Sequence, residues 1–376
     1  MNEQKNTACR ITAVVNSDFQ VNPPQKMIMN CGIRAFSHLT GRSAVLKEKG
    51  GFFSNLLHRT ELISSNSVDI ISFLVSADLE MRALQLIADA FKLNIFGSGS
   101  VYSENVEVIR DSGTIALNSD PPQPQENRFR MQKQLTGICC IVLRGMGDLV
   151  ARVALETGSC VPTITYGQGA GLRDRLGLWR ITIPAEKEIV TLIVNSFEVE
   201  EIMSIIVDSV KLDQPGKGFI YQFPVHRGLI NMKVSQGTRS QAASMEQVVL
   251  ALDEIKGGTE WRRRRLSVPF AGIRQKRFLT NLKELALHCD EGNGEDYVKI
   301  AMGAGASGAT ISEYRHLQSG EPRKVSPARE KCSIIVPPEL SSQVVTHFRY
   351  SGVLAESSNN DLLIRSVPKA YSYSAQ

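Results

Sequence analysis

Hydrophobic and polar positions are patterned most regularly between residues 135 and 225. Two segments of this region, 147–156 and 199–212, place apolar residues at helical spacing, and the first ends at Gly158. Runs of apolar and β-branched residues predict strands at 137–143, 163–166, 188–195 and 219–225. A long polar segment with several glycines, 167–180, separates the second strand from the third. The predicted order of elements is therefore β-α-β-β-α-β.

This order is typical of a ferredoxin-like fold of the α+β class, in which two helices cover one face of a sheet. The other face of the sheet needs a cover of its own, because an apolar sheet face is not stable in water. Similar units that pack face to face or edge to edge would supply that cover. Further copies of the same pattern within the chain would therefore complete the fold.

Two further copies are present in the sequence. Residues 69–102 align without a gap on residues 188–221, and nine positions are identical. Residues 153–158 align on 300–305, and Pro184-Ala185 aligns on Pro327-Ala328. The expected organisation is a first unit at 7–110, a Pro-rich linker at 111–132, a second unit at 133–233, a second linker at 234–279 and a third unit at 280–370. Repeats of this kind predict three units of one fold.

The two predicted linkers differ in character. The first contains Pro121-Pro122-Gln123-Pro124-Gln125 and has no apolar periodicity, which favours an extended spacer. The second contains apolar residues at helical spacing between Met245 and Ile255, which predict an amphipathic helix. A basic run follows at residues 262–277, and we expect it to be solvated.

The composition excludes several classes of protein. Of the 376 residues, 43 are Lys or Arg and 38 are Asp or Glu, so the net charge of +5 does not indicate a nucleic-acid partner. No apolar run approaches the length of a membrane helix, and the polar start of the chain favours a cytoplasmic protein. The seven cysteines include no C-x-x-C pair, which favours reduced thiols.

One turn in the second unit has a composition that suits an anion. Between the second helix and the last strand, Gly216 and Gly218 flank Lys217, so backbone N–H groups and an ammonium would face the same ligand. The alternative is that these glycines only end a helix. His226 and Arg227, just after the last strand, would add further positive charge.

These features together resemble the PII signal-transduction proteins, particularly the divergent PII-like branch. The resemblance is best over residues 135–229 and is weaker in the other two units. It depends on Arg144-Gly145, Gly158 to Ile164, Tyr166-Gly167-Gln168-Gly169, Glu186-Lys187-Glu188 and Pro215-Gly216-Lys217-Gly218.

PII proteins are trimers of ferredoxin-like subunits that bind adenine nucleotides between neighbouring subunits, and a long loop then docks on a target protein. The resemblance implies an intramolecular pseudo-trimer here, either monomeric or part of a higher oligomer. It implies no catalytic cofactor, and ATP, ADP or AMP as a regulatory ligand. The implied nucleotide-binding residues are Gly167, Gln168, Gly169, Gly216, Lys217, Gly218 and Arg227. The implied target contacts, in the effector loop, are Arg173, Asp174 and Arg175.

The implied function is non-enzymatic control of a transporter or metabolic enzyme, as in nitrogen regulation, with peripheral contact to a membrane if the target is a transporter. The copies are unequal, because Lys217 aligns with Ser98 and the third unit has no Gly-Lys-Gly in 356–360. If nucleotide binding needs this lysine, at most one of the three clefts between units would keep all the implied nucleotide-binding residues. The loop also lacks the tyrosine-containing modification motif of the best-known nitrogen regulators.

Three other functions stay open at the level of sequence. The alternatives are a scaffold that binds no ligand, a metal-binding member of the similar trimeric copper-tolerance fold, and a degenerate enzyme subunit. No catalytic motif is present. His288, Cys289, Asp290 and Glu291 form a cluster without a second ligand pair, so no metal site is predicted. The glycine-rich segment 302–308 follows a helix, which indicates helix termination.

Overall fold

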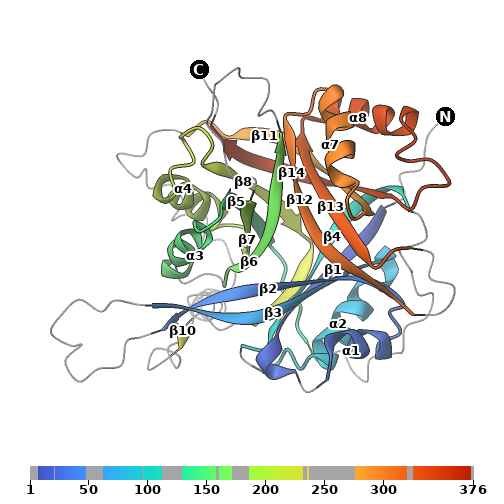
Figure 1. The fold of residues 1–376 in the computed structure, drawn as a ribbon. Coiled ribbons are helices and arrows are strands. Elements are labelled where there is room, and N and C mark those ends of the chain that lie inside the picture. Colours follow the sequence, from blue (N-terminus) through green and yellow to red (C-terminus); the bar gives the residue numbers. More distant parts are fainter. Residues whose placement is uncertain are drawn as a thin grey trace.

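The computed structural model describes residues 7–20, 22–47, 62–95, 97–111, 129–157, 161–171, 186–231, 235–236, 276–319 and 325–373. Within these residues the protein contains six α-helices and a 14-stranded, predominantly antiparallel sheet (Figure 1). The predicted mixture of helices and antiparallel strands is therefore confirmed. None of the helices described is both long and apolar enough to span a membrane.

The order β-α-β-β-α-β occurs three times along the described chain. In the first unit it comprises β1 (Thr7–Asn16), α1 (Pro24–Asn30), β2 (Ala35–Lys47), β3 (Leu62–Val75), α2 (Glu80–Ala90) and β4 (Gly99–Arg110). In the second it comprises β5 (Leu135–Leu143), α3 (Gly147–Glu156), β6 (Thr163–Gly171), β7 (Glu186–Asn195), α4 (Val199–Ser209) and β8 (Gly218–Val225). In the third it comprises β11 (Leu279–Asp290), α7 (Gly294–Gly303), β12 (Gly308–Gln318), β13 (Ala328–Val336), α8 (Pro338–Tyr350) and β14 (Asp361–Ser372).

Short elements supplement the three units. The 3-10 turns Ser17–Phe19 and Ala77–Leu79 belong to the first unit. Strands β9 (Arg227–Asn231) and β10 (Ser235–Gln236) follow the second unit in sequence but pair with β4 and β2 of the first. The end of the second unit therefore extends along its neighbour. The predicted linker helix at 245–255, most of the basic run and the effector-loop residues Arg173, Asp174 and Arg175 lie outside the described residues.

Each unit has the same order of strands. The sequences of neighbours are β2-β3-β1-β4, β6-β7-β5-β8 and β12-β13-β11-β14, and every pair within a unit is antiparallel. The helices pack on one face of their own unit, where apolar residues at helical spacing become buried. In α4, for example, Ile202, Met203, Ile206 and Val207 are all buried.

The units are joined through equivalent strands. Strands β2, β6 and β12 pair with one another, and β14 pairs with both β4 and β8. The sheet therefore returns on itself, with the helix pairs α1/α2, α3/α4 and α7/α8 outside it at three corners (Figure 1). The uncovered faces of the three units all turn toward a shared interior, which accounts for their apolar side chains.

The structure corrects the alignment of the second and third units by one residue. Gly147 donates its N–H to Glu188 Oε2 at 2.6 Å, and Gly294 donates to Glu330 Oε2 at 2.7 Å. Glu330 is therefore equivalent to Glu188, whereas the alignment of Pro184 with Pro327 makes Lys331 the equivalent residue. Because side chains alternate between the faces of a strand, the shift turns Lys331 away from the helices and toward the interior.

Candidate functional site

The Gly216–Gly218 turn has a structural reason for its last glycine. Gly216 has a φ of 74° and Gly218 a φ of 148°, both in the positive range that favours glycine. A Cβ on Gly218 would overlap the carbonyl oxygen of Ile141, and one on the equivalent Gly99 would overlap that of Val14. Close approach of two strands therefore explains this glycine without a ligand.

A turn at the equivalent position, between the second helix and the last strand, occurs in all three units, each time beside a different unit. Gly99 pairs with Asn231 of β9, and Phe219, which follows Gly218, pairs with Ser372 of β14. In the third unit the Arg110 guanidinium from β4 donates to the carbonyl oxygens of Glu356 and Ser358, at 3.2 and 3.0 Å. Each turn thus faces the end of a strand from another unit.

The Lys217 side chain is available for a ligand. It is half-buried and makes no hydrogen bond or ion pair with any residue that the structure describes. At the third turn, by contrast, Arg110 already occupies the carbonyl groups. The second turn therefore keeps a cation that is not committed to an internal partner.

Gly167, Gln168 and Gly169 lie within strand β6, which extends further than the sequence predicts. Gln168 and Gly169 pair with Ile311 and Thr310 of β12 in the third unit. A Cβ on Gly167 would come within 2.7 Å of the Ile311 carbonyl oxygen, so this glycine allows the two units to approach.

The two segments lie at the same end of the second unit's sheet. Gly218 pairs with Val142, Val142 with Glu188, and Glu188 with Tyr166, which precedes Gly167. Three strand spacings separate them, or about 14 Å. The structure thus brings Gly167–Gly169 and Gly216–Gly218 to the same end of the sheet, on its two outer strands, but not into contact.

An internal carboxylate occupies the N–H groups between these segments. Glu188 Oε2 accepts hydrogen bonds from the backbone N–H of Gly145 at 2.9 Å and of Gly147 at 2.6 Å. Its Oε1 lies 3.2 Å from Arg42 of the first unit, which also pairs with Asp148. The N-terminus of α3 is therefore neutralised by the protein itself.

Arg227 lies far from the Lys217 turn. Its Nε is 3.5 Å from Glu80 Oε2 in the first unit, and His226 Nδ1 is 2.7 Å from Glu80 Oε1. The whole length of β8, roughly 24 Å, separates Arg227 from Lys217. In this structure Arg227 contributes to the contact between the first and second units and is not beside the turn.

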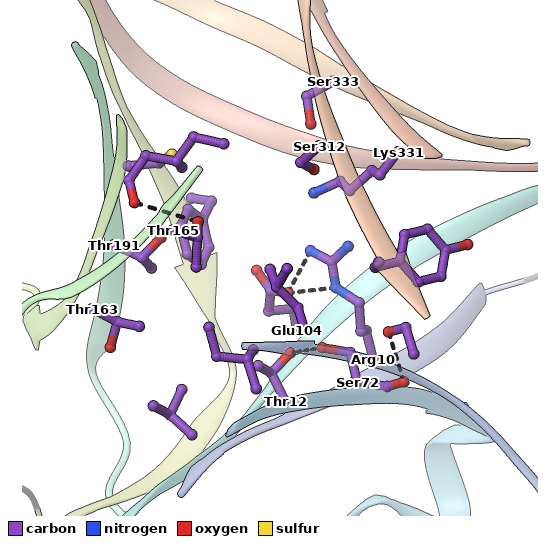
Figure 2. A pocket seen from close by; sticks show the side chains of 18 of the residues that line it. Arg10, Thr12, Ser72, Glu104, Thr163, Thr165, Thr191, Ser312, Lys331 and Ser333 are labelled. Atoms are coloured by element: carbon purple, nitrogen blue, oxygen red, sulfur yellow. Dashed lines mark hydrogen bonds and ion pairs between the residues drawn. The ribbon is translucent and has the colours of Figure 1, made fainter. Parts of the chain in front are cut away.

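A cavity of about 250 Å³ lies between the three units and is lined by all of them (Figure 2). Hydroxyl groups from equivalent cross-strand pairs surround it. These pairs are Ser37 with Ser72, Thr163 with Thr191, and Thr310 with Ser333. No contiguous sequence motif marks this site, because its residues come from separate strands of all three units.

A charged layer lies against one side of the cavity. Arg10 and Glu104 form an ion pair of 2.6 Å in the first unit. At the equivalent positions of the third unit the charges are exchanged, with Glu284 on β11 and Arg365 on β14. Arg365 pairs with both Glu104 and Glu284, so the ion pairs cross from one unit to the other. Although burial alone raises a carboxyl pKa, Arg365 helps to hold the pKa of Glu104 and that of Glu284 below the usual range.

The second unit has no charge in this layer. Gly137 and Phe223 occupy the positions of the ion pairs, and a Cβ on Gly137 would overlap the Phe223 ring. The Arg365 guanidinium lies 4.0 Å from the centre of that ring. An aromatic face thus closes the layer on the third side.

The third unit alone has a polar wall above this layer. Val14 pairs with Ile70 in the first unit and Ile141 with Ile189 in the second, whereas the equivalent pair in the third is His288 and Lys331. Burial lowers the pKa of the Lys331 ammonium, and Arg10 acts in the same direction. Burial also holds the pKa of His288 well below its ordinary value, so its imidazole is neutral at pH 7.

The described residues offer little else in the way of reactive chemistry. They contain no group of three or more His, Cys, Asp or Glu side chains arranged to hold a metal ion. The six cysteines among them are buried free thiols. His288 contacts Tyr314 at 3.0 Å through Nδ1, and Cys289 is buried in the core on the opposite face of β11.

No protein-family model matches the chain, and a search of curated proteins gives no match. The geometry of the units and of the spaces between them is therefore the basis for inferring a function.

Proposed function

We propose that the protein is a PII-like regulator, in which three ferredoxin-like units form a pseudo-trimer within one chain. The unit order β-α-β-β-α-β, the antiparallel neighbours and the pairing of equivalent strands between units support this arrangement. A closed arrangement of this kind leaves three inter-unit edges that are equivalent in backbone and different in side chains.

The cleft beside Lys217 binds an adenine nucleotide or a similar anionic metabolite in this proposal. The observation that carries it is the threefold recurrence of the turn against a neighbouring unit, with an uncommitted lysine at only one of the three positions. Two glycines with positive φ flank that lysine, a backbone conformation that suits an anion-binding nest. Gly167–Gly169, at the same end of the sheet, leads into the segment that would respond to the ligand and contact a target transporter or enzyme.

Calorimetric titration of the wild type and of Lys217→Ala with ATP, ADP and AMP tests this proposal. We expect at least one nucleotide to bind the wild type. The same nucleotide should bind Lys217→Ala at least about tenfold more weakly, because a charge-assisted contact to phosphate is lost. Lys299→Ala, which removes an exposed lysine on α7, is the matched control and should bind as the wild type does. Absence of binding by all three nucleotides would refute the nucleotide site.

A scaffold without a nucleotide is the second candidate, and one observation favours it. Packing against Ile141 and Ile311 accounts for Gly218 and Gly167, so neither glycine requires a phosphate. In that case the fold is intact, no nucleotide binds, and only the protein partners remain. Light scattering during size exclusion complements this test, since one pseudo-trimer has a mass of 41.4 kDa.

A further inference from the structure

The polar wall of the third unit is not needed to form the interior. The first and second units build the same strand pairs with Ile70 and Ile189 where the third has Lys331. An aliphatic side chain therefore satisfies the packing at this position. A buried ammonium lowers stability unless it is well paired, so its presence calls for a further explanation.

The Lys331 ammonium has no hydrogen-bond partner among the described residues. Its closest carboxylate oxygen is Glu284 Oε1 at 3.5 Å, beyond a normal hydrogen bond to a charged group. The lysine side chain is 25% exposed, and the space it reaches is the cavity. Figure 2 shows the Lys331 ammonium and the Arg10 guanidinium directed into the same space from opposite walls.

The carboxylates of this region are already matched by arginine. Glu104 pairs with Arg10 and with Arg365, and Glu284 pairs with Arg365. A third carboxylate at the cavity, Asp361, pairs with Arg329 at 3.4 Å. Among the described lysines and arginines that line the cavity, Lys331 alone lies beyond normal hydrogen-bond distance of a carboxylate.

Two further nitrogen atoms on the same wall lack partners. The Nε2 atoms of His288 and His316 are both buried without a hydrogen bond, and both residues line the cavity. His316 is only 7% exposed. A buried imidazole nitrogen left unpaired costs free energy, which a ligand group at hydrogen-bond distance would recover.

We propose that the central cavity binds a small hydroxylated metabolite that carries a carboxylate or phosphate group. The oxyanion lies between Lys331 and Arg10, and the serine and threonine hydroxyls of the three units hold the neutral polar part. A volume of about 250 Å³ is below the usual range for drug-sized ligands, so this ligand is smaller than a nucleotide. The site is separate from the cleft at Lys217 and does not depend on the nucleotide proposal.

Calorimetry and thermal unfolding with inorganic phosphate, glycerol 3-phosphate, malate and uncharged glycerol test the proposal. We expect saturable binding of phosphate or malate, tighter binding of glycerol 3-phosphate than of glycerol by about tenfold or more, and an increase in the unfolding temperature. Stronger binding of malate than of either phosphate would identify a carboxylate ligand, and the reverse a phosphate. Binding of glycerol as tight as that of the anions would overturn the proposal, as would no binding by any probe.

Lys331→Ile is the decisive variant, because isoleucine occupies the equivalent position in both other units. This variant should fold, and it should bind the anions at least about tenfold more weakly than the wild type does. Lys331→Arg should retain most of the affinity, and Lys331→Gln provides a polar neutral variant if the isoleucine variant fails to fold. Lys299→Ala should bind as the wild type does. Equal affinity in Lys331→Ile and wild type would place the anion elsewhere and refute the site.

The nucleotide and cavity proposals fail independently. Lys331→Ile should leave any nucleotide binding unchanged, and Lys217→Ala should affect nucleotide binding alone. Loss of both ligands in either single variant would contradict the assignment of two sites.

Discussion

The interior walls of the second and third units follow one backbone plan and differ in chemistry. Ile141 and Ile189 pair across β5 and β7, while His288 and Lys331 pair across β11 and β13. The second unit shows that this plan is satisfied by hydrocarbon. The polar groups of the third unit are therefore an addition to the fold and not a requirement of it, which is why they indicate a ligand.

The layer beneath these pairs carries a related lesson. Arg365 of the third unit pairs with Glu284 of its own unit and with Glu104 of the first, whereas Gly137 and Phe223 of the second contribute only an aromatic face. A layer with opposite charges on two sides and none on the third has a single favourable arrangement of the units. Such a layer favours one mutual placement of the units over the alternatives.

The largest expected effect is on this layer. Arg365→Met leaves Glu104 with one partner and Glu284 with only distant Lys331, so the free energy of unfolding should fall by about 3 to 5 kcal/mol. Phe223→Leu in the second unit is the matched control and should cost about 1 kcal/mol, since only packing and the guanidinium contact are lost. Urea unfolding monitored by circular dichroism measures both. Equal losses would show that the charges contribute no more than shape.

A smaller change in the free energy of unfolding is expected when the side chains at positions 189 and 331, on the interior walls of the second and third units, are exchanged. Ile189→Lys places an ammonium in the second unit without a facing Glu284, and we expect a loss of about 2 to 3 kcal/mol. Lys331→Ile without ligand removes the 3.5 Å ion pair with Glu284, but Glu284 keeps Arg365, so the loss should be no more than about 1 kcal/mol. The same unfolding assay checks both changes. A loss in Lys331→Ile similar to that in Ile189→Lys would mean that the lysine serves the fold.

The smallest expected effect is the change of stability with pH, which distinguishes the third unit's wall, with its buried histidine, from the apolar walls of the other two units. The folded pKa of His288 lies well below the ordinary value of 6.5, because burial and the nearby Lys331, Arg10 and Arg329 disfavour its charged form. The unfolded chain therefore binds the extra proton first. Stability from this group is complete above about pH 6.5 and is lost as the pH falls toward the folded pKa, at no more than about 1.4 kcal/mol per pH unit.

The expected measurement is a series of unfolding curves between pH 7.5 and about pH 5, a range that spans the unfolded histidine pKa. His288→Val, which copies the first unit, should flatten the loss of stability on acidification. His316, whose pKa burial also lowers, should keep part of the slope in that variant. An identical slope in wild type and His288→Val would show that other groups control the response.

Much of the second unit could be predicted from its hydrophobic pattern. The helix predicted at 147–156 is confirmed as Gly147–Glu156, and the strand predicted at 219–225 lies within Gly218–Val225. The strand predicted at 163–166 continues to Gly171, because Gly167 and Gln168 also pair with β7 and residues 168–171 pair with β12. That partner is more than a hundred residues away, so the local pattern gave no indication of it.

The cavity could not be predicted for a similar reason. Its lining residues come from strands of all three units, and each contributes through the direction of alternate side chains. A shift of one residue decides whether the side chain of Glu330 or that of Lys331 faces the interior. The alignment of the sequences makes Lys331 equivalent to Glu188, whereas the structure makes Glu330 equivalent to it. The strand pairings and the hydrogen bonds from the N–H groups of Gly147 and Gly294 fix that register.

The joining of three units in one chain also determines how many charges the interior can hold. In a trimer of identical subunits, a lysine at the position of Lys331 would occur three times around the same axis. Ammonium groups about 7 Å apart would repel one another by roughly 2 kcal/mol per pair at an effective dielectric constant near 20. A single polypeptide avoids this repulsion by substituting one copy alone, as with Ile70, Ile189 and Lys331. Three unequal units in one chain thus allow an asymmetric interior, whereas three identical subunits would form the same interior only at an electrostatic cost.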